Sequence, residues 1–268
     1  MEKKYILGVI GAGNMGMAIA NGLAKSISDL SKIALYNRSE EKREKNRKLG
    51  FSVLDNYSDI YSQSEMVLLA VKPQTFPEVL ANLPKLSEKP LVISIAAGIP
   101  FAKIENALGN DCPIIRCMPN TPLLLGKGAT QLVKNNAANK QQLDKVCSIF
   151  DSMGVTVVFD DENKLNDVIP FAGSAPAYVY SFTEGMLISA EKHGISRDDA
   201  IKLFCQTLIG SAEMMLSSGK TPKQLIDAVC SPNGTTIEAM NVLNEGNLYE
   251  LLSKANDKCI ARAYELGK

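Results

Sequence analysis

Histidine, tryptophan and paired cysteines are scarce or missing in this chain of 268 residues, and each shortage narrows the chemistry that it can perform. Tryptophan is absent, and the one histidine, His193, sits just before a glycine, a position typical of a helix carboxyl end. Hydrolytic and zinc chemistry at neutral pH usually recruits histidine, so the sequence favours neither. The six cysteines include no C-x-x-C pair, so we expect reduced, mostly buried thiols, no disulfides and no metal site.

Neither sign of charge dominates the sequence. Lysine plus arginine and aspartate plus glutamate each number 29, which gives a formal net charge of zero and no basic footprint for nucleic acid. The stretch Val168 to Thr183, which has no charged side chain, contains two prolines and is shorter than the roughly 20 residues that span a membrane. Only Tyr5 to Ile10 separates a basic start from a glycine-rich turn, which is too short for a secretion signal. We therefore expect a cytoplasmic protein that binds neither nucleic acid nor membrane.

Short apolar runs alternate with charged, amphipathic stretches through the first part of the chain. This alternation predicts an α/β fold of the Rossmann type, a doubly wound parallel sheet whose strands are joined by crossover helices. Residues Glu40 to Lys48 are all charged or Asn, and they predict a solvated surface helix to which we assign no function. The expected strands are Tyr5 to Ile10, Ile33 to Tyr36, Phe51 to Leu54, Met66 to Val71, Leu91 to Ala96, Ile114 to Met118 and Val155 to Phe159.

From about residue 163 the strand-like runs disappear and the pattern becomes helical. Gly194 and Gly219 are typical helix stops, while Thr221-Pro222 and Ser231-Pro232 are typical helix starts. We expect a nucleotide-binding domain over residues 1–162 and an all-helical domain over residues 163–268. The methionines of the helical part suit core filling and a subunit interface equally well. The expected helical segments are Ala177 to Glu191, Arg197 to Ser217 and Gln224 to Val229.

A glycine-rich motif follows the first expected strand and opens the first expected helix. The segment Gly11-Ala12-Gly13-Asn14-Met15-Gly16 has the spacing G-x-G-x-x-G. The first glycine of such a motif permits a tight turn, the second lets the backbone approach a diphosphate, and the third lets helix and strand pack closely. The helix amino terminus then offers free N–H groups and the positive end of the helix dipole to the diphosphate. The motif predicts a dinucleotide site, with a plain turn as the alternative.

The end of the second expected strand determines which dinucleotide is favoured. An NAD-selective site usually places an acid there to bind the ribose 2′-hydroxyl, but this chain has Asn37-Arg38-Ser39. Arg38 can pair with a 2′-phosphate and Ser39 can donate a further hydrogen bond. The sequence therefore favours NADPH, with NADH less favoured, unless Arg38 is an ordinary surface residue.

Small residues and prolines stand at the ends of three later strands, in Ala70-Val71-Lys72-Pro73, Ala96-Ala97-Gly98 and Met118-Pro119-Asn120-Thr121-Pro122. In a parallel sheet these ends face the same crevice as the glycine motif, so we expect them to form its walls. Ordinary turns use the same residue types, and that alternative stays open.

The segment from Cys230 to Met240 is the most informative part of the helical half. It reads Cys-Ser-Pro-Asn-Gly-Thr-Thr before a helical pattern, so it exposes backbone N–H groups at a second helix start. A small carboxylate is the natural guest of such a loop, and an ordinary capped loop is the alternative.

In this combination of motifs the chain resembles pyrroline-5-carboxylate reductases, which catalyse the last step of proline synthesis. The match runs in order along nearly the whole length, and its last three segments are far more specific than the glycine triplet. The segments that carry it are Ile10 to Gly16, Asn37 to Ser39, Val71 to Gln74, Ser94 to Gly98, Arg116 to Pro122, Gly173 to Tyr178 and Ser231 to Ala239.

The resemblance implies an NADPH-binding amino domain and a helical domain that forms a homodimer, often assembled into a larger ring. It implies that the substrate lies between one subunit's nicotinamide and the loop Ser231 to Thr236. The substrate set is then Ser231, Gly234, Thr235, Thr236 and Glu162, with Thr236 near the reacting nitrogen as the catalytic residue. The coenzyme set is Gly11, Ala12, Gly13, Asn14, Met15, Asn37, Arg38, Ser39, Asn56, Ala70, Val71, Lys72, Pro73, Ala97, Gly98 and Asn120.

Two residues depart from the pattern of these reductases. Ala175 stands where they usually have glycine, and Asn233 replaces the first glycine of S-P-G-G. Asn tolerates positive φ better than most residues, so Asn233 is a mild change, whereas Ala175 adds a methyl group where helices can cross closely.

The implied reaction is hydride transfer from NADPH to the C=N carbon of 1-pyrroline-5-carboxylate, with the proton supplied by solvent or by a water on Thr236. Three alternatives remain: reduction of another cyclic imine, a non-catalytic regulatory paralogue, and a β-hydroxyacid dehydrogenase. The last needs a lysine on the first helix of the second domain, and Asp167 to Glu184 contains none.

Overall fold

The computed structural model describes residues 3–267, which form two compact units. One unit extends to Pro176 and also includes the end of the chain from Cys259 onward. The other unit comprises residues 177–258.

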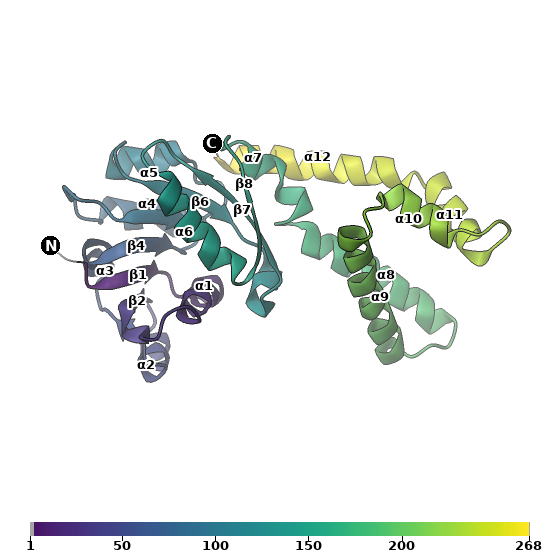
Figure 1. The fold of residues 1–268 in the computed structure, drawn as a ribbon, viewed down its shortest axis with the longest axis horizontal. Coiled ribbons are helices and arrows are strands. Elements are labelled where there is room, and N and C mark those ends of the chain that lie inside the picture. The colour runs from purple at the N-terminus through teal and green to yellow at the C-terminus, as the bar shows by residue number, and fades with distance from the viewer. Residues whose placement is uncertain (1–2, 268) are drawn as a thin grey trace. The chain divides into compact units, whose positions relative to one another are not determined.

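The first unit is built on one eight-stranded sheet in the order β3-β2-β1-β4-β5-β6-β7-β8 (Figure 1). Strands β2 and β3 lie on one side of β1 and β4 lies on the other, so the chain winds outward in both directions and the predicted doubly wound fold is confirmed. All neighbouring strands are parallel except β6 and β7. The strands are β1 Tyr5–Ile10, β2 Ile33–Tyr36, β3 Ser52–Val53, β4 Ser64–Leu69, β5 Leu91–Ser94, β6 Ile114–Met118, β7 Gly128–Lys134 and β8 Gly154–Val158.

Helices cover both faces of this sheet (Figure 1). Alternation along β1 sends Leu7 and Val9 to one face, where they join Ile19 of α1 in one buried cluster. Ile10 points to the other face and joins Ile104 of α5 in a second cluster. Each fully buried aliphatic side chain stabilises the fold by about 1.5 to 3 kcal/mol. The helices are α1 Asn14–Ala24, α2 Glu40–Lys48, α3 Tyr57–Gln63, α4 Phe76–Ala81, α5 Phe101–Leu108, α6 Lys140–Asp151 and α7 Lys164–Asp167, with short 3₁₀ turns η1 Leu30–Lys32, η2 Pro73–Thr75, η3 Thr121–Leu125 and η4 Ile169–Phe171.

Strand β7 is absent from the sequence-based expectation. It begins at a glycine and buries the polar residues Thr130 and Gln131, so its sequence lacks the apolar pattern of the other strands. The expected strand limits agree with β1, β2 and β6, and β4 begins and ends two residues earlier than expected.

The second unit consists of helices. Gly194 and Gly219 follow α8 and α9 with positive φ angles of 75° and 68°, as expected of helix stops. Thr221 caps α10 in a reciprocal capping box with Gln224. The expected start at Ser231-Pro232 is wrong, because Asn233 adopts a φ of 59° and delays the next helix. The helices are α8 Ala175–Lys192, α9 Arg197–Ser217, α10 Pro222–Val229, α11 Thr235–Glu245 and α12 Leu248–Gly267, of which α8 begins and α12 ends in the first unit.

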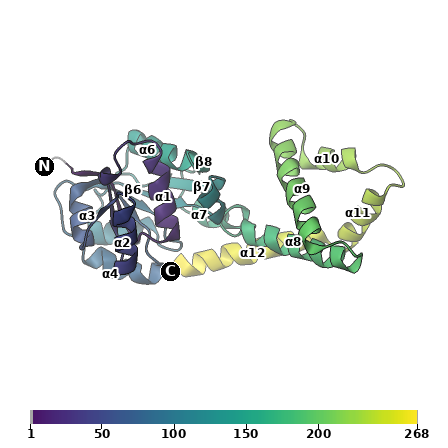
Figure 2. The same ribbon diagram turned by 90° about the horizontal axis from the view of Figure 1, so that it is seen from below.

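Helices α8, α9, α10 and α11 belong to this unit (Figure 2). The unit buries little of its own apolar surface. Between residues 177 and 258, all of which the structure describes, only Leu187 and Ala200 are buried. Phe182 of α8 packs on Phe204 of α9 with ring centroids 5.9 Å apart, yet Phe182 is still 50% exposed. Many other apolar side chains are exposed, including Met186, Leu203, Met214, Leu216, Val242 and Leu251.

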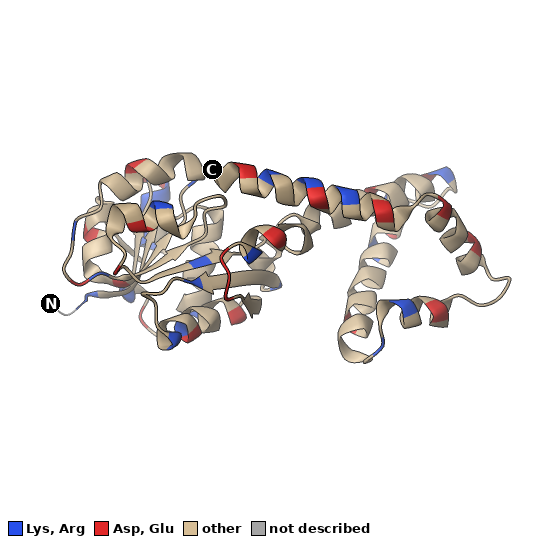
Figure 3. Cartoon of the chain, turned by 90° about the horizontal axis from the view of Figure 1, so that it is seen from above, with Lys and Arg blue, Asp and Glu red and all other residues tan. Residues whose placement is uncertain are grey.

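Polar side chains accompany this apolar surface. Both signs of charge alternate along α12 (Figure 3), where Glu250 pairs with Lys254 and Arg262 pairs with Glu265. Across residues 3–267, no helix combines the length and the apolar content that crossing a bilayer requires.

Candidate coenzyme and substrate site

The glycines of the β1–α1 loop are required by the backbone around them. Gly11 has a φ of 97°, and a Cβ there would lie 2.8 Å from the carbonyl carbon of Ala70. A Cβ on Gly16 would lie 2.6 Å from the carbonyl oxygen of Gly11. At Gly13, by contrast, an added Cβ would meet no heavy atom within 4 Å. The loop thus has a tight turn, a close packing point and open space between them, as a diphosphate site needs.

The amino terminus of α1 faces that open space without a side-chain cap. Gly13 is the N-cap residue, and no side chain accepts a hydrogen bond from the first turn. The first-turn N–H groups of a helix have no partner inside the helix, so they are available to an anion. Apart from the chain neighbours of Gly13, no described atom lies within 4 Å of the point that a Cβ on Gly13 would occupy. The residues present therefore fit a dinucleotide diphosphate.

Asn37 fixes this loop to the end of β2. Its Nδ2 donates a hydrogen bond to the carbonyl of Ala12 at 2.9 Å, and its Oδ1 accepts one from the N–H of Ser39 at 3.2 Å. The N–H groups of Gly11 and Ala12 donate to the carbonyl of Tyr36. Asn37 thus holds the glycine loop and the Arg38-Ser39 segment at a fixed separation.

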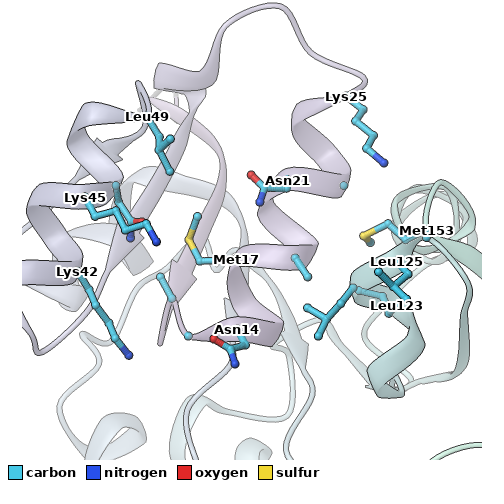
Figure 4. Close-up of a pocket in the computed structure, with 17 residues that line it drawn as sticks. Asn14, Met17, Asn21, Lys25, Lys42, Lys45, Leu49, Leu123, Leu125 and Met153 are labelled. Carbon is cyan, nitrogen blue, oxygen red and sulfur yellow. The ribbon is translucent and has the colours of Figure 1, made fainter. Parts of the chain in front are cut away.

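A cavity of 670 Å³ begins at Ala12, Gly13 and Asn14 and extends along α1, with α2 on one side and Met153 and the turn from Leu123 to Gly126 on the other (Figure 4). Lys25, the C-cap residue of α1, and Lys42 and Lys45 of α2 line it, and none of these three lysines forms an ion pair with a described residue. No function was predicted for the charged run that contains Lys42 and Lys45. The spacing of three residues between Lys42 and Lys45 could have indicated that both line one site, since residues three apart on a helix share a face.

Arg38 lies on the surface beside this edge, and its guanidinium is already engaged. Its Nη2 donates to both carboxylate oxygens of Glu78, at 3.1 and 2.9 Å. The two side chains are 66% and 61% exposed. Glu78 was not predicted from the sequence, because it is 40 residues away from Arg38 in the chain and belongs to no motif.

The other expected coenzyme residues follow β4, β5 and β6. Ala70 to Pro73 follow β4, and Ala97 and Gly98 follow β5, where Gly98 has a φ of 71°. Asn120 follows β6 and is 9% exposed, with its Oδ1 accepting from the N–H of Ala129 and its Nδ2 donating to the carbonyl of Ala172. Because β1, β2, β4, β5 and β6 are parallel, their carboxyl ends meet at one edge of the sheet, which brings these segments together.

Asn56 and Glu162 have protein partners of their own in the first unit. Asn56 is exposed and caps α3 by accepting a hydrogen bond from the N–H of Ser58. Glu162 accepts through Oε1 from the N–H of Phe101 and from Nη1 of Arg116, at 2.6 Å each. Arg116 itself is buried, with 5% of its side chain exposed.

The expected substrate loop lies in the second unit. The carbonyl of Ser231 accepts a hydrogen bond from the N–H of Gly234, and a Cβ at Gly234 would collide with the Ser231 hydroxyl. Gly234 is the N-cap of α11 and, as at α1, no side chain caps the helix. Thr235 and Thr236 form its first turn, and Thr236 is half-buried at one end of an apolar cavity of 660 Å³ between α9, α10 and α11.

Two parts of this chain match families of known proteins. Residues 162–266 match the family described as pyrroline-5-carboxylate reductase dimerisation, and residues 6–98 match NADP oxidoreductases dependent on coenzyme F420. The chain is 37% identical to the pyrroline-5-carboxylate reductase of Escherichia coli over all of both chains. It belongs to the pyrroline-5-carboxylate reductase family. The enzyme of the same name from Pisum sativum is 35% identical and covers 99% of this chain and 97% of its own length.

Solved structures of this family share the whole architecture. The pyrroline-5-carboxylate reductase of Coxiella burnetii is 34% identical, with a TM-score of 0.91 over 99% of this chain and all of its own. That of Plasmodium falciparum, solved with NADP bound, is 29% identical, with a TM-score of 0.88 over all of both chains. A reductive aminase from Aspergillus terreus is 14% identical with a TM-score of 0.62, a likeness of fold alone. The sequence-based resemblance to this family is confirmed.

All six cysteines are free thiols. Only Cys112 and Cys117 are buried, whereas Cys205 is exposed and Cys147, Cys230 and Cys259 are partly exposed. The expectation of mostly buried thiols is therefore wrong. Among the described residues, no group of three or more His, Cys, Asp or Glu side chains is placed to hold a metal ion.

Proposed function

We propose that this chain reduces 1-pyrroline-5-carboxylate to L-proline with NADPH as the hydride donor. The observation that carries the proposal is the uncapped amino terminus of α1 beside open space at Gly13, in a chain that is 37% identical to a reductase of this name. The reaction consumes one NADPH, one proton and the cyclic imine, and it yields NADP⁺ and the amine.

In this proposal the coenzyme lies along the carboxyl edge of the sheet. Gly11 to Met15 hold the diphosphate, Asn37 to Ser39 and Asn56 hold the adenosine end, and Ala70 to Pro73, Ala97, Gly98 and Asn120 line the nicotinamide end. Arg38 favours NADPH because its guanidinium can bind a 2′-phosphate, and NADH is used less well. The bound nicotinamide supplies the hydride.

The loop from Ser231 to Thr236, at the start of α11, holds the substrate in this proposal. The uncapped N–H groups of Thr235 and Thr236 and their hydroxyls receive the carboxylate, while Ser231 and Gly234 keep the loop in shape. A threonine hydroxyl is too weak an acid to protonate the amine alone, so Thr236 orients the ring nitrogen or a water that delivers the proton. Glu162 is also part of the proposed substrate-binding set.

Most of the rate enhancement in this proposal comes from holding the two reactants in position. Holding the donor and the imine carbon in line converts a bimolecular step into an intramolecular one, which contributes up to about 7 to 11 kcal/mol. No side chain has to act as a strong acid or base, which is consistent with a chain that has a single histidine.

The match to a dimerisation family supports self-association, and we propose a homodimer formed by residues 163–268. The exposed apolar side chains of α8, α9 and α11 are the surface that would be covered. We also propose a cytoplasmic location, which six free thiols suit.

The test is a spectrophotometric assay of the purified protein with 1-pyrroline-5-carboxylate and NADPH. The proposal predicts loss of absorbance at about 340 nm together with formation of proline. Coenzyme binding without turnover would indicate a regulatory paralogue, and faster turnover of a six-membered cyclic imine would indicate another substrate.

A further inference from the structure

Arg38 and Glu78 form an ion pair at the edge where the adenosine end of the coenzyme is expected. Both carboxylate oxygens of Glu78 accept from one nitrogen of Arg38, Nη2, at 3.1 and 2.9 Å. Nη1 and Nε of Arg38 have no hydrogen-bond partner among the described residues, so one end of the guanidinium is occupied and the rest is open.

α4 fixes the backbone of Glu78. Glu78 lies in the first turn of α4, where the helix dipole stabilises a carboxylate, and its carbonyl accepts a hydrogen bond from Nδ2 of Asn82. α4 follows β4, whereas Arg38 follows β2, so two different crossovers bring the two charges together.

Two aromatic rings complete the same patch. Tyr36, at the end of β2, packs edge-on against Tyr57 of α3, with ring centroids 5.2 Å apart. Burial, and after it the negative charge of Glu78, raises the pKa of Tyr57, while Arg38 acts in the opposite direction. Both charges are thus close to the ring pair, and the patch holds one cation, one anion and two rings.

We propose that Glu78 is a coenzyme-specificity residue that weakens the preference of this chain for NADPH over NADH. This inference rests on the proposed function, because it assumes that Arg38 receives the 2′-phosphate. The end of β2 lacks the acid that NAD-selective sites carry there. Glu78 supplies a carboxylate to the same place from α4.

Glu78 opposes binding of the 2′-phosphate in two ways. Its carboxylate occupies Nη2 of Arg38, so a 2′-phosphate has to displace it or bind only through Nη1 and Nε. Its negative charge also repels the dianionic phosphate at short range. NADH has a hydroxyl in place of the phosphate, so neither effect acts on it.

The expected size of the change in coenzyme binding follows from the exposure of the Arg38–Glu78 ion pair. Ion pairs between side chains that are more than half exposed are weak, and removing one is expected to change binding of a competing charge about two- to fivefold. Salt screens exposed charges, so the change should shrink at high ionic strength.

The experiment compares the full-length wild type with Glu78→Gln, Arg38→Ala and the double variant. Glu65→Gln is the matched control, because Glu65 also forms an exposed ion pair, with Lys145, and lies on β4 near its amino end. Binding of NADPH and NADH is measured by fluorescence titration, and binding of 2′,5′-ADP and 5′-AMP by calorimetry. The two nucleotides differ by the 2′-phosphate and need no nicotinamide.

The proposal predicts that Glu78→Gln binds NADPH and 2′,5′-ADP about two- to fivefold more tightly, with NADH and 5′-AMP unchanged. The gain should vanish in the Arg38→Ala background and fall in about 0.5 M salt. An unchanged ratio, equal gains for both coenzymes, or weaker NADPH binding would overturn it, the last because Glu78 would then be orienting Arg38. A wild type that binds neither coenzyme would instead refute the proposed function.

Discussion

Nη1 of Arg116 lies 2.6 Å from Oε1 of Glu162, and the same oxygen accepts a hydrogen bond from the N–H of Phe101 at 2.6 Å. One carboxylate oxygen thus joins the middle of β6, the first residue of α5 and the segment before α7. α5 begins three residues after Gly98, so the contact also anchors the helix that follows a proposed wall of the coenzyme site.

Replacing Glu162 with Gln should destabilise the protein, because Arg116 is buried and would lose its carboxylate partner. We expect a loss of about 2 to 4 kcal/mol in the free energy of unfolding, reduced from that of a fully buried pair because Glu162 is partly exposed. Urea denaturation measures it, with Glu65→Gln as the exposed-pair control. A loss equal to that of the control would show that the contact contributes little.

Gly13 and Gly11 should respond differently to alanine. Gly13→Ala places a methyl group in open space, so the free energy of unfolding should stay within about 1 kcal/mol while NADPH binding weakens at least about tenfold. Gly11→Ala meets the backbone of Ala70 at positive φ and should cost at least about 1 to 3 kcal/mol of stability. Denaturation and coenzyme titration of both variants separate the two effects. Unimpaired NADPH binding by Gly13→Ala would contradict the diphosphate assignment.

Arg38→Ala should reduce discrimination between the coenzymes. A charge-assisted hydrogen bond contributes about 1.5 to 3 kcal/mol, so the preference for NADPH should fall roughly tenfold to a hundredfold. The ratio of kcat/KM for the two coenzymes measures it. Equal ratios in the variant and the wild type would remove Arg38 from the site.

Thr236→Ala should slow turnover without disturbing the fold, because Thr236 is in the first turn of α11 and is not its N-cap. We expect a loss of about 1 to 3 kcal/mol in transition-state stabilisation, measured as kcat at saturating NADPH. Thr235→Ala is the neighbouring comparison. Turnover at the parent rate would show that Thr236 does not orient the substrate.

Cys112 should make stability fall at alkaline pH. Burial raises the pKa of its thiol to about 11, above the value in the unfolded chain. The stabilisation is therefore complete below about pH 9 and lost as the pH rises toward 11, by about 2 to 3 kcal/mol. Cys112→Ala should show a smaller decline over that range in denaturation measured at several pH values. Parallel declines would mean that other groups are responsible.

The parts of the fold predicted from sequence are those whose signals are local. β1 is a short apolar run that ends at a glycine, and α9 runs from a serine cap to a glycine stop, so both were predicted with the limits that the structure gives. β7 was missed because its stability comes from pairing with β6 and β8 rather than from its own composition.

In the predicted site, too, the features with local sequence signals were predicted and those that depend on distant contacts were not. The glycine motif lies within six consecutive residues, and its geometry agrees with the expectation. The partners of Arg38 and Glu162 are 40 and 46 residues away, and only the folded sheet brings Glu78 and Arg116 to them. Sequence patterns identify which residues carry charge, but they do not show which charges meet.

The most direct test of the account is the steady-state rate of NADPH oxidation by the purified wild type with 1-pyrroline-5-carboxylate, compared with Gly13→Ala. The account predicts that the wild type forms one proline for each NADPH oxidised and that Gly13→Ala, although folded, loses most of this rate at low NADPH. NADPH oxidation that is absent in the wild type, or equally fast in both proteins, would contradict it.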